Sequence, residues 1–358
     1  MKALYNINMK KNILQTLIAI FLGLISFSNS FSQDVHFSQF DAAPLYFNPA
    51  QSGLFDCDHR VILNYKSQWS AYNTFMASFD QPIPLIKFKG GTFGAGALIN
   101  SDYGGEISYG NTHLKLMPAY HKDIIPTVLK ISVGLDIMMN LMTIDENSVV
   151  LPGQIDPITG QPTPGADFSN PTQFYADMGI GVNAMYNLEN DLPINGGVTF
   201  YRLFGSGGGG IASNTSTTNY RRFSLNANSI IPLNSTITFL PSFIFLNQRI
   251  YNEMNFGTYT QFAVGQYTPV IDALYLGVWH RYGDALIFGF AFDKPLSENI
   301  TMNFGFSYDL TVSRFRDSDK WIYTNNVGTD SFEFSIKLIN CRKEIIANPP
   351  GIINDPFR

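Results

Sequence analysis

The amino-acid sequence predicts an all-β fold: a transmembrane antiparallel β-barrel of about fourteen strands, preceded by a secretory signal and an N-terminal periplasmic or plug segment. Three observations predict it. Apolar and polar residues alternate with a period of two through long segments, the chain opens with a signal-like stretch, and charged and aromatic residues each make up 14%. The mean hydropathy is only +0.01. A barrel combines these features because it places its lipid-facing residues at alternate positions.

Residues 1–32 are typical of a secretory signal peptide. Three lysines precede an apolar run over 13–27, and Ser30 and Ser32 provide a small-x-small cleavage pattern. The run is shorter than the ~20 apolar residues of a spanning helix. No cysteine follows the expected cleavage site, so we do not expect a lipid anchor. Loss of the three lysines changes the net charge from −5 to −8, which disfavours nucleic acid as a partner.

The next region, residues 33–59, contains large apolar side chains around two prolines. It matches neither a regular helix nor a strand. Its aromatic residues must be buried, either inside the barrel as a plug or against a periplasmic partner. We favour the plug because intramolecular burial costs no association entropy. The candidate plug or partner-binding residues are Phe37, Gln39, Phe40, Pro44, Leu45, Asn48 and Pro49.

The predicted barrel covers residues 60–340 and is followed by a tail, 341–358. Its candidate strands are 60–69, 72–80, 92–100, 108–121, 127–142, 173–187, 195–204, 219–230, 236–247, 254–265, 270–282, 285–293, 299–313 and 331–340. The second, seventh and tenth have the weakest alternation, so twelve or sixteen strands stay possible.

Charged side chains indicate which face of each strand points toward the aqueous lumen. An Arg or Lys on the lipid face near the bilayer midplane costs roughly 2–4 kcal/mol, so charges belong in the polar phase. Eight charges obey this rule in five strands: Arg60, Lys66, Lys130, Asp136, Asp177, Asp309, Glu333 and Lys337. Of these, we expect Lys130, Asp136, Asp177 and Asp309 to project into the lumen.

Connector lengths predict the orientation in a bacterial outer membrane. Such barrels have short periplasmic turns and longer surface loops. The three longest connectors, 143–172, 204–219 and 314–330, all follow odd-numbered strands, which predicts a periplasmic N-terminus. Within the last connector, Trp321, Ile322 and Tyr323 are candidate partner-binding residues.

No motif predicts catalysis, a cofactor or a metal site. The glycine-rich stretch 205–210 has neither the lysine nor the helix of a phosphate-binding loop. The five histidines are dispersed, and no nucleophile elbow has suitable partners. Cys57 and Cys341 could form a disulfide or stay unpaired. A soluble β-sandwich or propeller is the alternative fold, but its strands are usually shorter.

Several short motifs, in order along the whole chain, resemble the PorP/SprF family of outer-membrane proteins of the type IX secretion system. They include 37–40 (FSQF), 48–50 (NPA), 60–69 with its Asn-Tyr and Gln-Trp pairs, 79–82 (FDQP) and 292–296 (FDKPL). The tail after the last strand departs from the family pattern. The family has no catalytic residues.

The resemblance implies a non-enzymatic barrel in membrane lipid that supports protein secretion or cell-surface attachment. The implied partners are cargo with a C-terminal sorting domain, such as a large adhesin in gliding motility, and other type IX secretion components. The alternative is a porin-like diffusion channel for small solutes with the N-terminal segment outside the lumen. A membrane-embedded hydrolase is the least favoured class.

Overall fold

The computed structural model describes residues 36–69, 71–104, 109–144, 172–188, 192–205, 212–213, 220–265, 268, 270–312 and 330–341. Within them, fourteen long strands form one antiparallel sheet. They are β1 (His59–Gln68), β2 (Tyr72–Phe88), β3 (Gly91–Gly104), β4 (Tyr109–Ile125), β5 (Leu129–Thr143), β6 (Thr172–Leu188), β7 (Leu192–Tyr201), β9 (Arg222–Ser229), β11 (Ile237–Gln248), β12 (Tyr251–Ala263), β13 (Ala273–Arg281), β14 (Ala285–Pro295), β15 (Ile300–Thr311) and β16 (Ser331–Asn340). Two short strands, β8 (Ala212–Ser213) and β10 (Ile231–Pro232), pair with β6 and β11.

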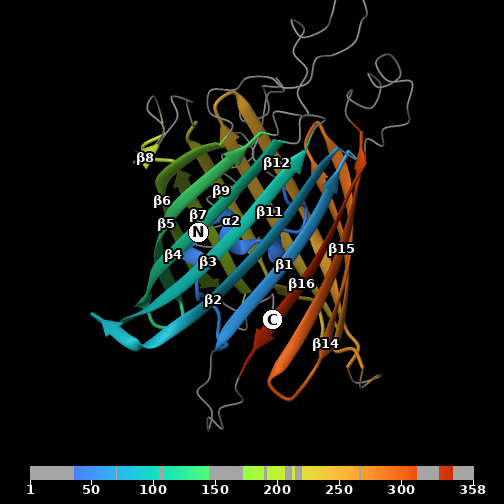
Figure 1. Ribbon diagram of the computed structural model, residues 1–358. Helices are drawn as coiled ribbons and strands as arrows, with labels where there is room; N and C mark the ends of the chain where they lie inside the picture. Colours follow the sequence, from blue (N-terminus) through green and yellow to red (C-terminus); the bar gives the residue numbers. More distant parts are fainter. Residues whose placement is uncertain are drawn as a thin grey trace, which may run out of the picture.

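The sheet closes into a barrel, which confirms the predicted fold class and strand number. Each long strand pairs with the next, and β16 returns to pair with β1 from His59↔Asn340 to Gln68↔Ser331. Figure 1 shows the tilted strands forming a continuous wall around the short helix α2 (Pro44–Phe47). No helix of the described part of the chain is long and apolar enough to cross a lipid bilayer.

The alternation divides the wall into two faces. In β5, Val133, Leu135, Ile137 and Met139 are exposed on the outside, while their polar neighbours face inward and are buried. The same division holds in β16, where Phe332, Phe334 and Ile336 are exposed, whereas Glu333 and Lys337 are buried. The outer surface is therefore apolar and aromatic, as lipid requires, and the interior is rich in charge.

The strand boundaries differ from the prediction most clearly in β2, which continues to Phe88 instead of ending at residue 80. The added part contains prolines at 82 and 84, and proline cannot donate to a strand ladder. Beyond Arg60↔Asp80, however, β2 has no partner on the β1 side and pairs only with β3. The prolines thus lie where one edge of the strand is free. A bulge between Ile83 and Lys87 accommodates the irregular stretch.

The lipid-facing register makes a direct prediction. Ile137 lies near the middle of β5 and faces outward. Ile137→Arg is expected to reduce the free energy of unfolding by roughly 2–4 kcal/mol, because a guanidinium then enters the apolar layer. Urea titration of the barrel refolded in lipid vesicles measures the change, with Ile137→Leu as the matched control. An arginine variant as stable as the leucine variant would contradict the assigned face.

Candidate functional site: a plugged lumen with an open vestibule

The segment before β1 fills the middle of the barrel. It forms three single turns: the 3-10 turn η1 (Phe40–Ala42), α2, and the 3-10 turn η2 (Pro49–Gln51). Pro44 and Pro49 begin α2 and η2, where the missing N–H removes no helical hydrogen bond. Most of the segment is buried, including Phe37, Leu45 and Asn48. We name residues 36–58 the plug.

The barrel wall is shaped to receive the backbone of the plug. A Cβ at Gly134 in β5 would run into the backbone of Pro49 and Ala50. At Gly181 and Gly197, in β6 and β7, a Cβ would strike the side-chain amide of Asn48. That amide donates to the Val182 carbonyl at 3.1 Å and accepts from Ala50 N at 2.9 Å. Glycine therefore permits a close approach that any larger residue would block.

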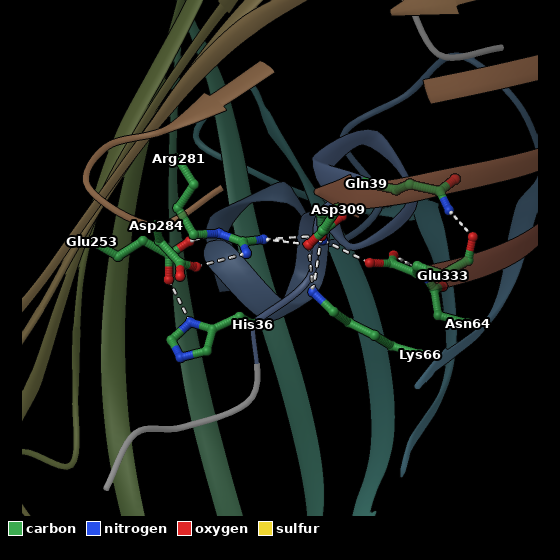
Figure 2. Close-up of polar contacts among 10 residues, drawn as sticks. His36, Gln39, Asn64, Lys66, Glu253, Arg281, Asp284, Asp309 and Glu333 are labelled. Carbon is green, nitrogen blue, oxygen red and sulfur yellow. Dashed lines mark hydrogen bonds and ion pairs between the residues drawn. The ribbon is translucent and has the colours of Figure 1, made fainter. Parts of the chain in front are cut away.

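A buried charge cluster holds the first residues of the plug (Figure 2). Ser38 N donates to Glu333 Oε2 at 2.6 Å, and the Ser38 hydroxyl donates to Asp309 Oδ2 at 2.6 Å. The same Asp309 oxygen lies 3.3 Å from Lys66 Nζ and 3.0 Å from an Arg281 guanidinium nitrogen. All four charged side chains are nearly inaccessible to solvent. Their attraction is strong in this environment because water screens it little.

The cluster continues around the lumen on both sides. Arg281 Nε lies 3.4 Å from Glu253 Oε1, and the other carboxylate oxygen of Glu253 forms an ion pair with His36 Nδ1. On the opposite side, Gln39 Nε2 donates to the Glu333 carbonyl at 3.0 Å. Figure 2 shows these residues converging from several strands on the plug. They lie near the strand ends from which the long connectors leave.

A second contact fixes the middle of the plug through Tyr46. The Arg222 guanidinium stacks over the Tyr46 and Tyr201 rings, 4.6 and 4.3 Å from their centroids, and donates to the Tyr46 hydroxyl at 2.8 Å. The Tyr201 hydroxyl donates to the Tyr46 carbonyl at 2.9 Å. Nearby, Lys115 Nζ lies 3.2 Å from Asp136 Oδ2 and 4.6 Å from the centroid of the Tyr201 ring.

A third contact anchors the end of the plug where β1 begins. Asp80 accepts from the Arg60 guanidinium at 3.0 and 2.9 Å and from Gly53 N at 2.9 Å. Cys57 and Cys341 form a disulfide, which links the plug to the residue after β16. The pairing that the sequence left open is thereby resolved. It joins the two ends of the barrel at its closing seam.

A cavity of about 440 Å³ lies between the plug and the end of the barrel that carries the short turns. We name it the vestibule. Its edge is lined by Thr127 and Val128, in the β4–β5 turn. Lys130 and Asp123 also line the vestibule, with 3.8 Å between Lys130 Nζ and Asp123 Oδ1. Aromatic side chains from the plug and the wall line its interior: Phe40, Phe47, Phe55, Tyr259 and Trp279. Its size and its aromatic lining suit a ligand or a peptide.

The structure locates most of the residues singled out from the sequence. Six of the plug candidates, Phe37, Gln39, Pro44, Leu45, Asn48 and Pro49, are buried, and Phe40 lines the vestibule. Asp136 and Asp309 are buried in ion pairs, and Asp177 accepts from the backbone of Met178 and Phe204 at 2.7 and 3.1 Å. Lys130 is half-exposed at the vestibule edge. Trp321, Ile322 and Tyr323 lie outside the described residues.

Sequence reasoning missed several residues that hold the plug. They are Ser38, Tyr46, Lys115, Arg222, Glu253 and Arg281. The four charged residues among them occupy the inward phase of their strands. The test of charge against phase would have found Lys115, Arg222 and Arg281 if applied to β4, β9 and β13, whereas Glu253 lies just before the predicted strand 254–265. In the described part of the chain, no group of three or more His, Cys, Asp or Glu side chains could hold a metal ion.

The comparisons with known proteins agree with this architecture. A family model described as "Type IX secretion system membrane protein PorP/SprF" matches residues 29–328. The toluene transporter TbuX of Ralstonia pickettii has a TM-score of 0.53 and 12% identity, covering 84% of this chain and 93% of TbuX. The CymD monoaromatic hydrocarbon channel has a TM-score of 0.50 and 10% identity, covering 85% and 93%. At such identities the likeness shows the fold alone. No curated protein matches the chain.

Proposed function

Since the chain belongs to the PorP/SprF family of type IX secretion system membrane proteins, we propose that it is a non-enzymatic scaffold that binds secreted cargo or other secretion components. The cargo would carry a C-terminal sorting domain, and a large adhesin used in gliding motility is one example. The barrel would support export of such a protein or its attachment to the cell surface. This proposal requires recognition by surfaces of the barrel and no catalytic chemistry.

The filled lumen is the observation that carries the proposal. The plug crosses the interior and is held by the hydrogen bonds from Ser38 to buried Asp309 and Glu333, by the Arg222–Tyr46 stack and by the disulfide. A diffusion channel needs a continuous aqueous path through the barrel. Eight-stranded barrels are filled by their own side chains, whereas the lumen of a barrel with more strands stays open unless a plug fills it. The alternative function, a channel for small solutes, would require the plug to move.

The same geometry supports an orientation. We place the short turns and the vestibule toward the periplasm, and the long connectors toward the cell surface. Strand β1 would then enter the membrane from the periplasm, as the predicted periplasmic N-terminus requires. His36, the first described residue, lies higher in the lumen beside Glu253. Secretion components would reach the vestibule from the periplasm, and cargo would meet the long connectors.

The connector 314–330 provides the test. Its Trp321, Ile322 and Tyr323 are the proposed contacts for cargo. Replacing 314–330 by a short Gly-Ser linker is expected to reduce recovery of secreted cargo in pull-down from native membranes by about tenfold or more. This expectation follows because buried aromatic residues dominate binding energy at protein interfaces. The same replacement of the polar stretch 214–219, in another long connector and without aromatic residues, serves as the control.

Both variants must still fold and insert as barrels. A folded barrel changes its mobility in gel electrophoresis when it is heated, so this shift is measured for each variant. Cargo recovery that is equal for the two variants would exclude the 314–330 connector as the binding surface. Loss of cargo in both variants would assign binding to the surface as a whole.

A further inference from the structure

The vestibule is a cavity lined by apolar and aromatic side chains of both the plug and the wall. Its plug side is formed by Phe40, Pro44, Phe47, Leu54 and Phe55. Its wall side carries Leu240, Tyr259 and Trp279, and the Tyr259 and Trp279 rings meet edge to face with centroids 4.3 Å apart. Extended proline-rich peptides bind to aromatic-lined grooves of this kind, because their backbone is already ordered.

The last residues of the chain begin beside this site. Cys341 follows β16 and is bonded to Cys57, while Phe55 and Asp56, just before Cys57, line the vestibule. Residues 342–358 lie outside the described part of the chain. They number seventeen, enough to extend roughly 55–60 Å. The disulfide therefore tethers the tail at the vestibule with ample length to enter it.

The tail has the composition of a peptide that an aromatic-lined site would bind. It contains Pro349, Pro350 and Pro356, together with the paired isoleucines 352–353 and Phe357. It begins with Arg342 and Lys343, which follow Cys341 in the sequence, while Asp56 and Asp58 flank its disulfide partner Cys57. The charges of the two sequences that meet at the disulfide are therefore complementary, and the apolar residues of the tail follow within its reach.

We propose that the vestibule binds the chain's own C-terminal tail, residues 342–358, as an extended proline- and isoleucine-rich peptide. The tether makes this binding intramolecular, so a weak intrinsic affinity suffices because the effective concentration of a short linked segment is in the millimolar range. The bound tail occupies the vestibule, so a partner that binds there must first displace it.

Peptide binding to two forms of the refolded barrel tests the proposal. One form is the full mature chain and the other ends at Cys341, which keeps the disulfide. A fluorescent peptide of sequence 342–358 should bind the truncated barrel saturably in an anisotropy titration, and the full chain at least about tenfold more weakly, since its site is occupied. A peptide carrying Ile352→Ser, Ile353→Ser and Phe357→Ser should bind neither. Equal binding of the wild-type peptide to both barrels would overturn the proposal.

A matched pair of barrel variants locates the site. Val128→Glu puts a charge at the vestibule edge, whereas Val270→Glu changes an exposed residue that does not line the vestibule. Only the first should weaken peptide binding. In native membranes, a photoreactive phenylalanine analogue at position 357 should crosslink to vestibule residues of the same chain. Crosslinks solely to a second copy or to another protein would overturn the assignment. None of these readouts depends on cargo capture.

Discussion

Removing the plug is expected to turn a sealed barrel into an open pore. Replacing residues 36–52 by a Gly-Ser linker keeps Cys57 and all fourteen long strands but empties the middle of the lumen. Barrels of sixteen to eighteen strands leave an aqueous channel, and a fourteen-stranded wall without its plug approaches that size. Proteoliposomes that contain the variant should therefore swell in isotonic sucrose, whereas those with the intact protein should not.

The control for this experiment keeps the plug and alters a partly exposed ion pair within the wall. Asp284→Asn changes a residue whose side chain is 33% exposed and lies 3.2 Å from Arg281, so the lumen should stay sealed. The gel mobility shift on heating verifies that both barrels are folded. An impermeable barrel without its plug would show that something other than residues 36–52 blocks the lumen.

Loss of the Asp309 carboxylate is expected to cost roughly 3–5 kcal/mol of folding free energy, the range for breaking a buried ion pair. Asp309 is 1% exposed and faces both Lys66 and Arg281, so Asp309→Ala leaves buried Lys66 without this counter-charge and removes one of the carboxylates around Arg281. Urea titration in lipid vesicles measures the loss. Asp284→Ala is the matched control and should cost less than about 1 kcal/mol, as partly exposed pairs usually do. Equal costs for the two variants would mean that the Asp309 cluster does not hold the fold.

The barrel could be predicted from the sequence because each strand must place apolar side chains toward the lipid and polar side chains toward the lumen. Every second residue from Leu129 to Leu141 is apolar, and the structure places a strand there over Leu129–Thr143. Even the weakest candidates correspond to strands: 72–80 lies within β2, and 195–204 and 254–265 overlap most of β7 and β12. Boundaries failed where a strand has a free edge or bends, as at Pro82 in β2 and at Arg202, whose φ of 57° ends β7 early.

The plug was only partly predictable. The aromatic residues around Pro44 and Pro49 had to be buried, and that much follows from their chemistry. The part of the wall that contacts the plug could not be predicted from the sequence, because Gly181 and Gly197 become neighbours of Asn48 only once the register of β6 and β7 is fixed. The cluster of Ser38, Asp309 and Arg281 joins residues more than two hundred positions apart. Alternation within one strand carries no information on such pairs.

Single-channel recording of the intact mature protein in planar lipid bilayers tests the central claim most directly. A barrel whose lumen is filled by its own N-terminal segment should insert and leave the bilayer electrically silent at all moderate voltages. Steady open-channel steps from the intact protein would contradict a plugged scaffold and favour a diffusion channel.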